Sequence, residues 1–330
     1  MAKLIVVVGV TGAQGSSVAH TFLRLPGWRV RGITRNPSGL VAQALATEGV
    51  ELIKADLDDK HSLSPAFEDA NVIFSNTDFF LPFQNAMGSK EITGGRTIYE
   101  YAYDTEVAQG TNIAEAASSP TVLKTLERFI YSSLSEARKW SGGKYKHVYH
   151  FDSKAETIRN IQSRFPAVAE RMSFVQIGHY VTNWKNFPAL APQKQSDGSF
   201  ILARPSPPET PVPFVVPHQD TGPFVKALVD LPPGTHLWGV SELMTFPEWA
   251  KTWGDTLGHK IEFKQVSDEE FWQGVPEEFK NEISEGFAYA DEFGYTGGDP
   301  EVQTAAQLGI EIPCTSMAEY IKNEDWSSVV

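Results

Sequence analysis

The first 180 residues alternate between short apolar runs and amphipathic stretches. Short runs rich in Val and Ile are typical of buried strands, whereas apolar positions that recur every three or four residues are typical of helices. Strands are predicted at residues 4–8, 28–34, 50–55, 72–75, 128–133 and 173–177. Helices are predicted between them, at residues 16–25, 38–48, 106–117 and 152–164. This alternation predicts βαβ units and an α/β fold with a doubly wound parallel Rossmann sheet.

Two stretches interrupt this rhythm. Residues 79–104 contain aromatic side chains and three glycines without a clear period, so we expect an insertion after the fourth strand. Residues 193–217 are rich in proline, which disfavours both a helix and a central strand. The prolines concerned are Pro205, Pro207, Pro208, Pro211 and Pro213.

The C-terminal half shows helical patterns, and we see no strand pattern of its own in it. It contains two capping boxes and a predicted helix at 276–290. We interpret the acidic positions of 268–285 as solvated helix faces rather than paired carboxylates. We therefore expect a Rossmann domain at 1–180 and a smaller, mainly C-terminal α+β lobe at 181–330, with part of 220–260 returning to the first domain.

Composition and charge exclude several classes of function. The 330 residues carry 28 Lys and Arg against 41 Asp and Glu, a net charge of −13 that disfavours direct binding to nucleic acid or to anionic membranes. The lone Cys314 permits neither an intrachain disulfide nor a cysteine-based zinc site. The apolar opening at 4–10 is shorter than the roughly 20 residues of a membrane span. Because it leads into glycines, we expect no signal peptide and a cytoplasmic location, with the nucleus left open.

A glycine-rich turn directly follows the first predicted strand and precedes the first predicted helix. Gly9, Gly12 and Gly15 have G-x-x-G-x-x-G spacing. A dinucleotide requires a tight turn at the strand end, a close approach of the backbone to the diphosphate, and close helix–strand packing; the glycines meet these needs in that order. Backbone N–H groups and the positive end of the helix then bind the anion, unless this is an ordinary glycine turn. The candidate residues are Gly9, Thr11, Gly12, Ala13, Gln14 and Gly15.

The residues after the second predicted strand indicate which dinucleotide binds. An acidic side chain at this place would bind the ribose of NAD, but the chain has Thr34, Arg35 and Asn36. The guanidinium of Arg35 can form charge-assisted hydrogen bonds with a 2′-phosphate, which predicts NADP(H) as the cofactor. The alternative is a solvated loop arginine. Residues after the third and fourth strands complete the predicted coenzyme site: Asp56, Leu57 and Asn76.

Further motifs accompany the glycine turn, at residues 34–36, 131–134, 141–145, 150–154 and 220–222. Together they resemble the NmrA-like family, a branch of the atypical short-chain dehydrogenases/reductases, over residues 3–310. The resemblance implies a Rossmann domain, a small second lobe, a cleft between the two and NADP(H) binding. It leaves the activity open, because the founding member regulates a nitrogen-responsive transcription factor whereas other members are reductases, many of them in fungal natural-product pathways.

The catalytic set of a typical short-chain reductase is Tyr-x-x-x-Lys with a serine. Here Lys154 occupies the lysine position and His150 the tyrosine position, four residues apart and so on one helix face. Three hypotheses follow. Lys154 holds the coenzyme ribose at a catalytically silent site, His150 acts as the acid, or another hydroxyl reaches the substrate. The hydroxyl candidates are Tyr149, Tyr180 and Ser133.

The segment after the sixth predicted strand is a candidate for substrate contact, because ligands bind at the carboxyl edge of a doubly wound sheet. Tyr180 and Asn183 are expected to face a substrate or the nicotinamide. A predicted apolar wall consists of Phe79, Phe80, Phe83 and Trp184, unless these aromatics pack the two lobes together. We expect no metal, because no third ligand at metal spacing joins His218 and Asp220.

Two functions remain open on the sequence. The first is an NADPH-dependent reductase of a small carbonyl, enone or imine, of the kind found in secondary metabolism. The second is a non-catalytic NADP(H) redox sensor that controls a transcription factor or another protein partner. The missing tyrosine favours the sensor, whereas the aromatic segment 79–83 favours a substrate pocket. The sequence leaves the oligomeric state undecided, a homodimer included.

Overall fold

The computed structural model describes residues 2–87, 94–273 and 277–330. At its centre is an eight-stranded parallel sheet with the strand order β14-β11-β6-β5-β4-β1-β2-β3, which confirms the predicted fold class. The strands are β1 (Lys3–Val8), β2 (Trp28–Thr34), β3 (Glu51–Lys54), β4 (Val72–Ser75), β5 (Arg128–Ser133), β6 (Met172–Ile177), β11 (His236–Gly239) and β14 (Val302–Gln303). The strand order reverses between β1 and β4, where doubly wound folds bind their ligands.

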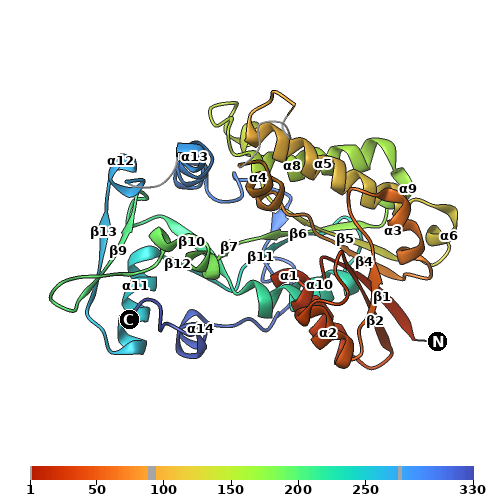
Figure 1. Cartoon of the computed structure of the whole chain (residues 1–330), viewed down its shortest axis with the longest axis horizontal. Coiled ribbons are helices and arrows are strands. Elements are labelled where there is room, and N and C mark those ends of the chain that lie inside the picture. Colours follow the sequence, from red (N-terminus) through yellow and green to blue (C-terminus); the bar gives the residue numbers. More distant parts are fainter. Residues whose placement is uncertain (1, 88–93, 274–276) are drawn as a thin grey trace.

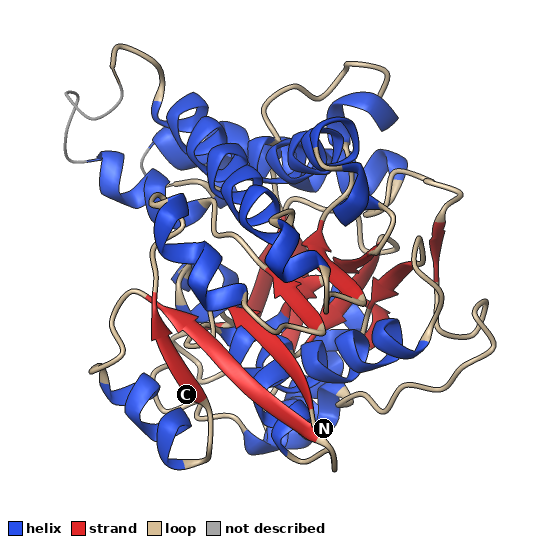
Figure 2. Cartoon of the chain, turned by 90° about the vertical axis from the view of Figure 1, so that its right-hand side faces the viewer, coloured by secondary structure: helices blue, strands red, loops and turns tan. Residues whose placement is uncertain are grey.

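Helices cover both faces of this sheet (Figures 1 and 2). One face carries α1 (Ala13–Leu23), α2 (Leu40–Thr47) and α10 (Pro217–Asp230). The other carries α3 (Lys60–Phe67), α5 (Ile98–Ala117), α6 (Pro120–Leu123), α8 (Tyr149–Arg164) and α9 (Pro166–Ala169). Side chains of β1 alternate between the cores on the two faces, Leu4 and Val6 in one and Ile5 and Val7 in the other. Burial on both sides is why this strand is a continuous apolar run in the sequence.

The segment predicted as an insertion is partly helical. It contains α4 (Phe80–Met87), and α5 begins at Ile98 rather than at the predicted residue 106. Thr97 and Glu100 form a capping box at this earlier start, with Thr97 Oγ1 accepting the Glu100 N–H at 3.2 Å. The remaining part of the predicted insertion, 88–93, lies outside the described residues.

The second lobe contains two three-stranded sheets, β12-β10-β7 and β13-β9-β8. Its strands are β7 (His179–Tyr180), β8 (Gln193–Lys194), β9 (Phe200–Arg204), β10 (Pro211–Val215), β12 (Glu242–Thr245) and β13 (Ile261–Gln265). Its helices are α11 (Phe246–Leu257), α12 (Asp268–Phe271), α13 (Glu277–Phe293) and α14 (Met317–Asn323), with short 3-10 turns η1 (Val181–Lys185) and η2 (Pro188–Leu190). The remaining helix, α7 (Ala137–Trp140), precedes α8. Among the described residues, no helix combines the length and apolar composition needed to cross a bilayer.

Two expectations about this half of the chain are wrong. The half does have strands of its own, and the proline-rich segment supplies β9 and the central strand β10. Pro211 and Pro213 pair with β12 along β10, whereas β7 reaches β10 at Phe214 and Val215. At its prolines β10 therefore has a sheet neighbour on one side, and a strand with a free side tolerates a missing N–H donor.

Candidate functional site

The glycine turn has the geometry that its spacing predicts. Gly9 has a φ of +65°, and Gly12 donates its N–H to the Gly9 carbonyl at 2.9 Å. A Cβ on Gly15 would overlap the Gly9 carbonyl oxygen and lie 2.7 Å from its carbon. Helix α1 begins directly after Gly12, which offers no side chain to cap its first amides. Thr11, Gly12 and Ala13 are exposed, so these amides can bind an anion such as a diphosphate.

The other predicted coenzyme residues lie at the carboxyl ends of β2, β3 and β4. Thr34 is buried and accepts the N–H of Asn36 at 3.3 Å, whereas Arg35 is exposed and has no ion-pair partner among the described residues. A Cβ on Gly9 would lie 3.9 Å from the Asn76 amide nitrogen, which places Asn76 beside the turn. After β3, Asp56 accepts the N–H of Asp58 and Leu57 accepts a hydrogen bond from Asn112 at 2.8 Å.

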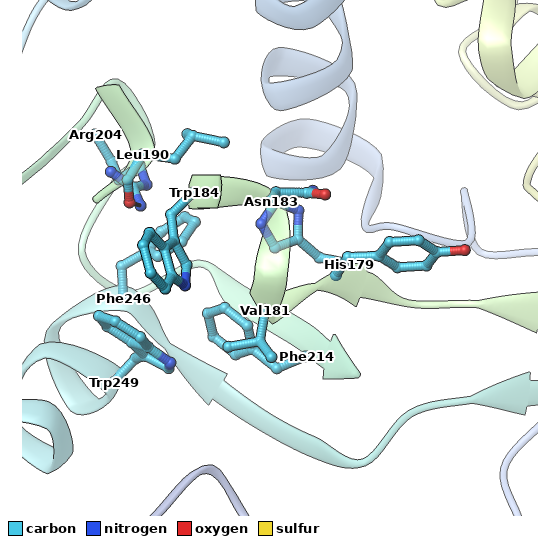
Figure 3. A pocket seen from close by; sticks show the side chains of 10 residues that line it. His179, Val181, Asn183, Trp184, Leu190, Arg204, Phe214, Phe246 and Trp249 are labelled. Carbon is cyan, nitrogen blue, oxygen red and sulfur yellow. Dashed lines mark hydrogen bonds between the residues drawn. The ribbon is translucent and has the colours of Figure 1, made fainter. Parts of the chain in front are cut away.

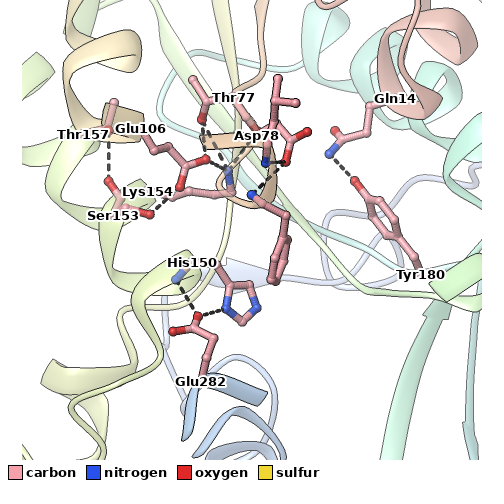
Figure 4. Close-up of polar contacts among 12 residues, drawn as sticks. Gln14, Thr77, Asp78, Glu106, His150, Ser153, Lys154, Thr157, Tyr180 and Glu282 are labelled. Atoms are coloured by element: carbon pink, nitrogen blue, oxygen red, sulfur yellow. Dashed lines mark hydrogen bonds and ion pairs between the residues drawn. The ribbon is translucent and has the colours of Figure 1, made fainter. Parts of the chain in front are cut away.

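Lys154 is buried on α8, and its charge is compensated. Its Nζ lies 2.5 Å from Oε1 of Glu106, and it donates to the Thr77 carbonyl at 3.2 Å. Thr77 Oγ1 and Ser153 Oγ also donate to the Glu106 carboxylate (Figure 4). Burial by itself lowers the pKa of Lys154, but the attraction and hydrogen bond of Glu106, together with the nearby Tyr131 and Tyr180 hydroxyls, outweigh it and the pKa is raised. Lys154 therefore stays charged while most of that charge is neutralised locally.

The sequence prediction missed Glu106, although a signal was present. Within α5 the buried positions Ala102, Glu106, Gly110 and Ala114 recur every four residues, which places the glutamate in the stripe that faces the protein. Gly110 lies in the same stripe, and a Cβ there would overlap Thr157 of α8. The two helices thus pack closely enough for Glu106 to reach Lys154.

His150 lies in the first turn of α8 and pairs with Glu282 of α13. Nδ1 of His150 bonds to the Glu282 carboxylate, which also accepts the N–H groups of Tyr149 and His150 at 2.9 Å (Figure 4). Since Nδ1 faces a carboxylate oxygen, which can only accept, Nδ1 is the donor of this hydrogen bond, and Nε2 lies on the other side of the ring. The ring centroids of Phe80 and His150 are 5.4 Å apart.

Glu282 corrects our interpretation of the acidic stretch. We predicted solvated faces throughout 268–285, but the Glu282 side chain is 1% exposed. Its carboxylate caps the start of α8, for which Val148, the N-cap residue, supplies no side-chain hydrogen bond. An anion at this position is stabilised by the amides and the dipole of the helix.

Tyr180 lies across the site from His150, and its hydroxyl points to the glycine turn (Figure 4). Gln14 Nε2 donates to this hydroxyl at 2.5 Å, and burial raises the pKa of Tyr180 to about 12. The two other hydroxyl candidates make different contacts. Ser133 donates to the Val175 carbonyl of the neighbouring strand at 3.4 Å, and the Tyr149 ring stacks on Tyr99 at 5.7 Å.

The predicted aromatic wall divides into two groups. Phe79, Phe80 and Phe83 form one cluster beside His150, with Phe79 and Phe83 stacked at 6.2 Å. Trp184 instead stacks on Trp326 at 4.6 Å in the core of the second lobe. A small pocket in this lobe is lined by Trp184, Asn183, Tyr180, His179 and Arg204, among others (Figure 3).

In the His218–Asp220 region, the Asp220 carboxylate is occupied by hydrogen bonds from within the protein. Asp220 accepts the Thr315 N–H at 3.1 Å and a hydrogen bond from the Ser241 hydroxyl. The part of the chain that the structure describes has no group of three His, Cys, Asp or Glu side chains that could hold a metal ion.

Comparison with known proteins finds fungal relatives in sequence and solved structures with the same fold. The NmrA-like family domain-containing oxidoreductase hkm9 of Aspergillus hancockii is 28% identical over 325 residues, covering 93% of this chain and 89% of its own. The structure of NmrA, a negative transcriptional regulator, in complex with NADP has a TM-score of 0.73 at 20% identity, covering 99% of this chain and 97% of its own. The NADPH-dependent quinone oxidoreductase QOR2 of Escherichia coli, complexed with NADPH, has a TM-score of 0.62 at 17% identity, covering 96% of this chain and 98% of its own. These two structures establish the fold, and the NmrA-like family pattern matches residues 1–328: the chain belongs to the NmrA-like family.

Proposed function

We propose that this protein is an NADP(H)-dependent oxidoreductase that reduces a small carbonyl, enone or imine. The observation that carries the proposal is the His150–Glu282 pair. The carboxylate fixes the orientation of the histidine ring, which lies next to Phe80. Lys154 and Tyr180 border the same site (Figure 4). The names of the curated relatives, which are oxidoreductases, support the same class of activity.

The residues around the glycine turn fit an NADP(H) coenzyme. The turn presents exposed amides for a diphosphate, and Arg35, without an ion-pair partner among the described residues, presents a cation for a 2′-phosphate. The Gln14 Oε1 atom is buried and has no hydrogen-bond partner among the described residues, which leaves an acceptor for a ligand donor. Asn76 and Lys154 would contact the ribose side. The bound coenzyme would supply hydride to the substrate.

His150 is the residue that we assign as the proton donor to the substrate oxygen or nitrogen. Glu282 orients the ring by accepting from Nδ1, and the imidazolium form of His150 would transfer its second proton from Nε2 to the substrate. Tyr180, kept protonated by burial, is a hydrogen-bond donor on the opposite side of the site. Phe79 and Phe80 lie beside the histidine, with ring centroids 6.1 and 5.4 Å from its own, and would give a bound substrate apolar surroundings.

Replacing His150 by phenylalanine is expected to lower kcat by roughly 100-fold or more, since a positioned acid contributes that much. The measurement is the loss of NADPH absorbance with a panel of quinones, enones and imines. The matched control is His147→Phe, because His147 pairs in the same way with Glu285 but half of its side chain is exposed. Equal losses in both variants would refute the role of His150. Glu282→Gln is expected to lower kcat less than His150→Phe does.

Replacing Arg35 by alanine is expected to weaken NADPH binding at least tenfold and to leave NADH binding nearly unchanged, because the lost guanidinium contacts only the 2′-phosphate. Calorimetric titration with each coenzyme measures this. Arg29→Ala is the control, because Arg29 is exposed on β2, the strand that ends directly before Arg35. An unchanged preference for NADPH in the Arg35 variant would contradict the assignment.

A redox sensor is the second candidate function. It is favoured by Glu106, whose carboxylate neutralises the lysine that in a reductase lowers the pKa of a tyrosine. A sensor requires different affinities for NADPH and NADP+, because a ligand pair with equal affinities shifts no equilibrium. Titration with both coenzyme forms, together with the substrate panel, separates the two functions.

A further inference from the structure

A second pocket lies away from the glycine turn, between the main sheet and the second lobe. It has a volume of about 390 Å³, which is within the range of small-molecule sites. Its walls come from the 207–211 segment, from the end of β11, from β12 and from the C-terminal end of α13. The lining residues used below are Glu209, Trp238, Leu243, Asp291 and Tyr295.

The charged side chains that line this pocket are acidic. Asp291 and Glu209 line it, and none of the described lysines, arginines or histidines does. The Asp291 Oδ1 atom is buried and has no hydrogen-bond partner among the described residues. Burial raises the pKa of Asp291, although hydrogen bonds from Ser206 and Thr210 lower it. A buried carboxylate oxygen without a partner is costly, so this site is incomplete without a donor, preferably a charged one.

Aromatic rings supply the rest of a cation site. Trp238 and Tyr295 both line the pocket, and the faces of such rings attract ammonium groups. The Trp238 Nε1 atom is buried and unpartnered in the described structure, so it offers one donor to a ligand acceptor. Leu243 is 52% exposed at the rim and adds apolar surface for the body of a ligand.

Tyr295 lies between this pocket and the candidate active site. Its ring centroid is 5.3 Å from that of Phe151, which in turn is 4.7 Å from that of His150. A ligand against Tyr295 is thus separated from the histidine by two rings in contact. Phe151 is 4% exposed, so these packed rings separate the pocket from the His150 side.

We propose that this pocket binds a small organic cation, a protonated amine with an apolar or aromatic body, through Asp291 and the rings of Trp238 and Tyr295. The proposal goes beyond the proposed function, because packed rings separate this pocket from His150. The binding itself does not require turnover.

The test is calorimetric titration of the full-length protein with phenethylammonium, phenylethyl alcohol and phenylacetate, which share one ring and differ in charge. Phenethylammonium is expected to bind about tenfold or more tightly than the alcohol, on the scale of one hydrogen bond to a charged group. Asp291→Asn is expected to remove that advantage and to leave alcohol binding unchanged. Asp255→Asn is the control, because Asp255 is exposed on α11 and pairs with Lys251.

Leu243→Lys is a second variant that places a positive charge at the exposed rim without changing the buried carboxylate. It is expected to weaken phenethylammonium binding severalfold. This variant keeps the proposal testable if Asp291→Asn lowers the stability of the fold. Equal affinity for the amine and the alcohol, or an amine advantage that survives both substitutions, would overturn the proposal. NADPH is titrated separately: amine binding without NADPH binding refutes the proposed function alone, and NADPH binding without an amine preference refutes the pocket alone.

Discussion

Replacing Glu106 by glutamine is expected to lower the free energy of unfolding by about 3–5 kcal/mol. The side chain keeps its size, but the ammonium of Lys154, which is 10% exposed, loses the carboxylate 2.5 Å away. A buried charge without a partner retains its desolvation cost without the compensating attraction. Urea unfolding followed by circular dichroism at neutral pH measures the loss.

Two variants establish that the effect comes from burial of the pair. Glu115 lies on the same helix and pairs with Lys60 at 2.7 Å, but both side chains are exposed. Glu115→Gln is therefore expected to cost at most about 1 kcal/mol. Combining Glu106→Gln with Lys154→Met is expected to cost less than the sum of the single changes, because no unpaired buried charge remains. If Glu106→Gln costs no more than Glu115→Gln, the buried-pair interpretation fails.

Replacing Gly15 by alanine is expected to lower NADPH affinity by roughly 100-fold or more and to destabilise the fold by several kcal/mol. The added Cβ would lie 2.7 Å from the Gly9 carbonyl carbon and 2.8 Å from the Val10 Cα, which are backbone atoms that cannot rotate away. Either the turn or the start of α1 must shift, and both position the amides that would bind the diphosphate. Calorimetric titration and thermal unfolding measure the two losses.

Gly12→Ala provides a graded comparison within the same turn. A Cβ there would have the Gly9 carbonyl oxygen at 3.3 Å as its nearest neighbour, so the fold should lose less stability than with Gly15→Ala. Gly12 is exposed at the turn, however, and a methyl group can still hinder a diphosphate. Full NADPH affinity in the Gly15 variant would show that the coenzyme binds elsewhere.

The parts of the fold that were predictable from the sequence depend on local patterns. The apolar run of β1 and the three glycines after it lie within thirteen residues of chain, and each property of the turn follows from those residues. The prolines of β10 misled the prediction because their effect depends on how many neighbours a strand has. β7 pairs with β10 at Phe214 and Val215, which no local pattern encodes.

The sequence by itself therefore determined the doubly wound sheet and the candidate dinucleotide turn, since alternating periods and glycine spacing are short-range properties. Tertiary structure alone decided the partners of the two candidate catalytic residues. Glu106 lies 48 positions before Lys154, and Glu282 lies 132 positions after His150. The Glu282 side chain is 1% exposed and that of Glu285, one turn away on the same helix, is 26% exposed. A helical period shows which positions share a face, but which of those carboxylates is buried depends on the distant element that packs against it.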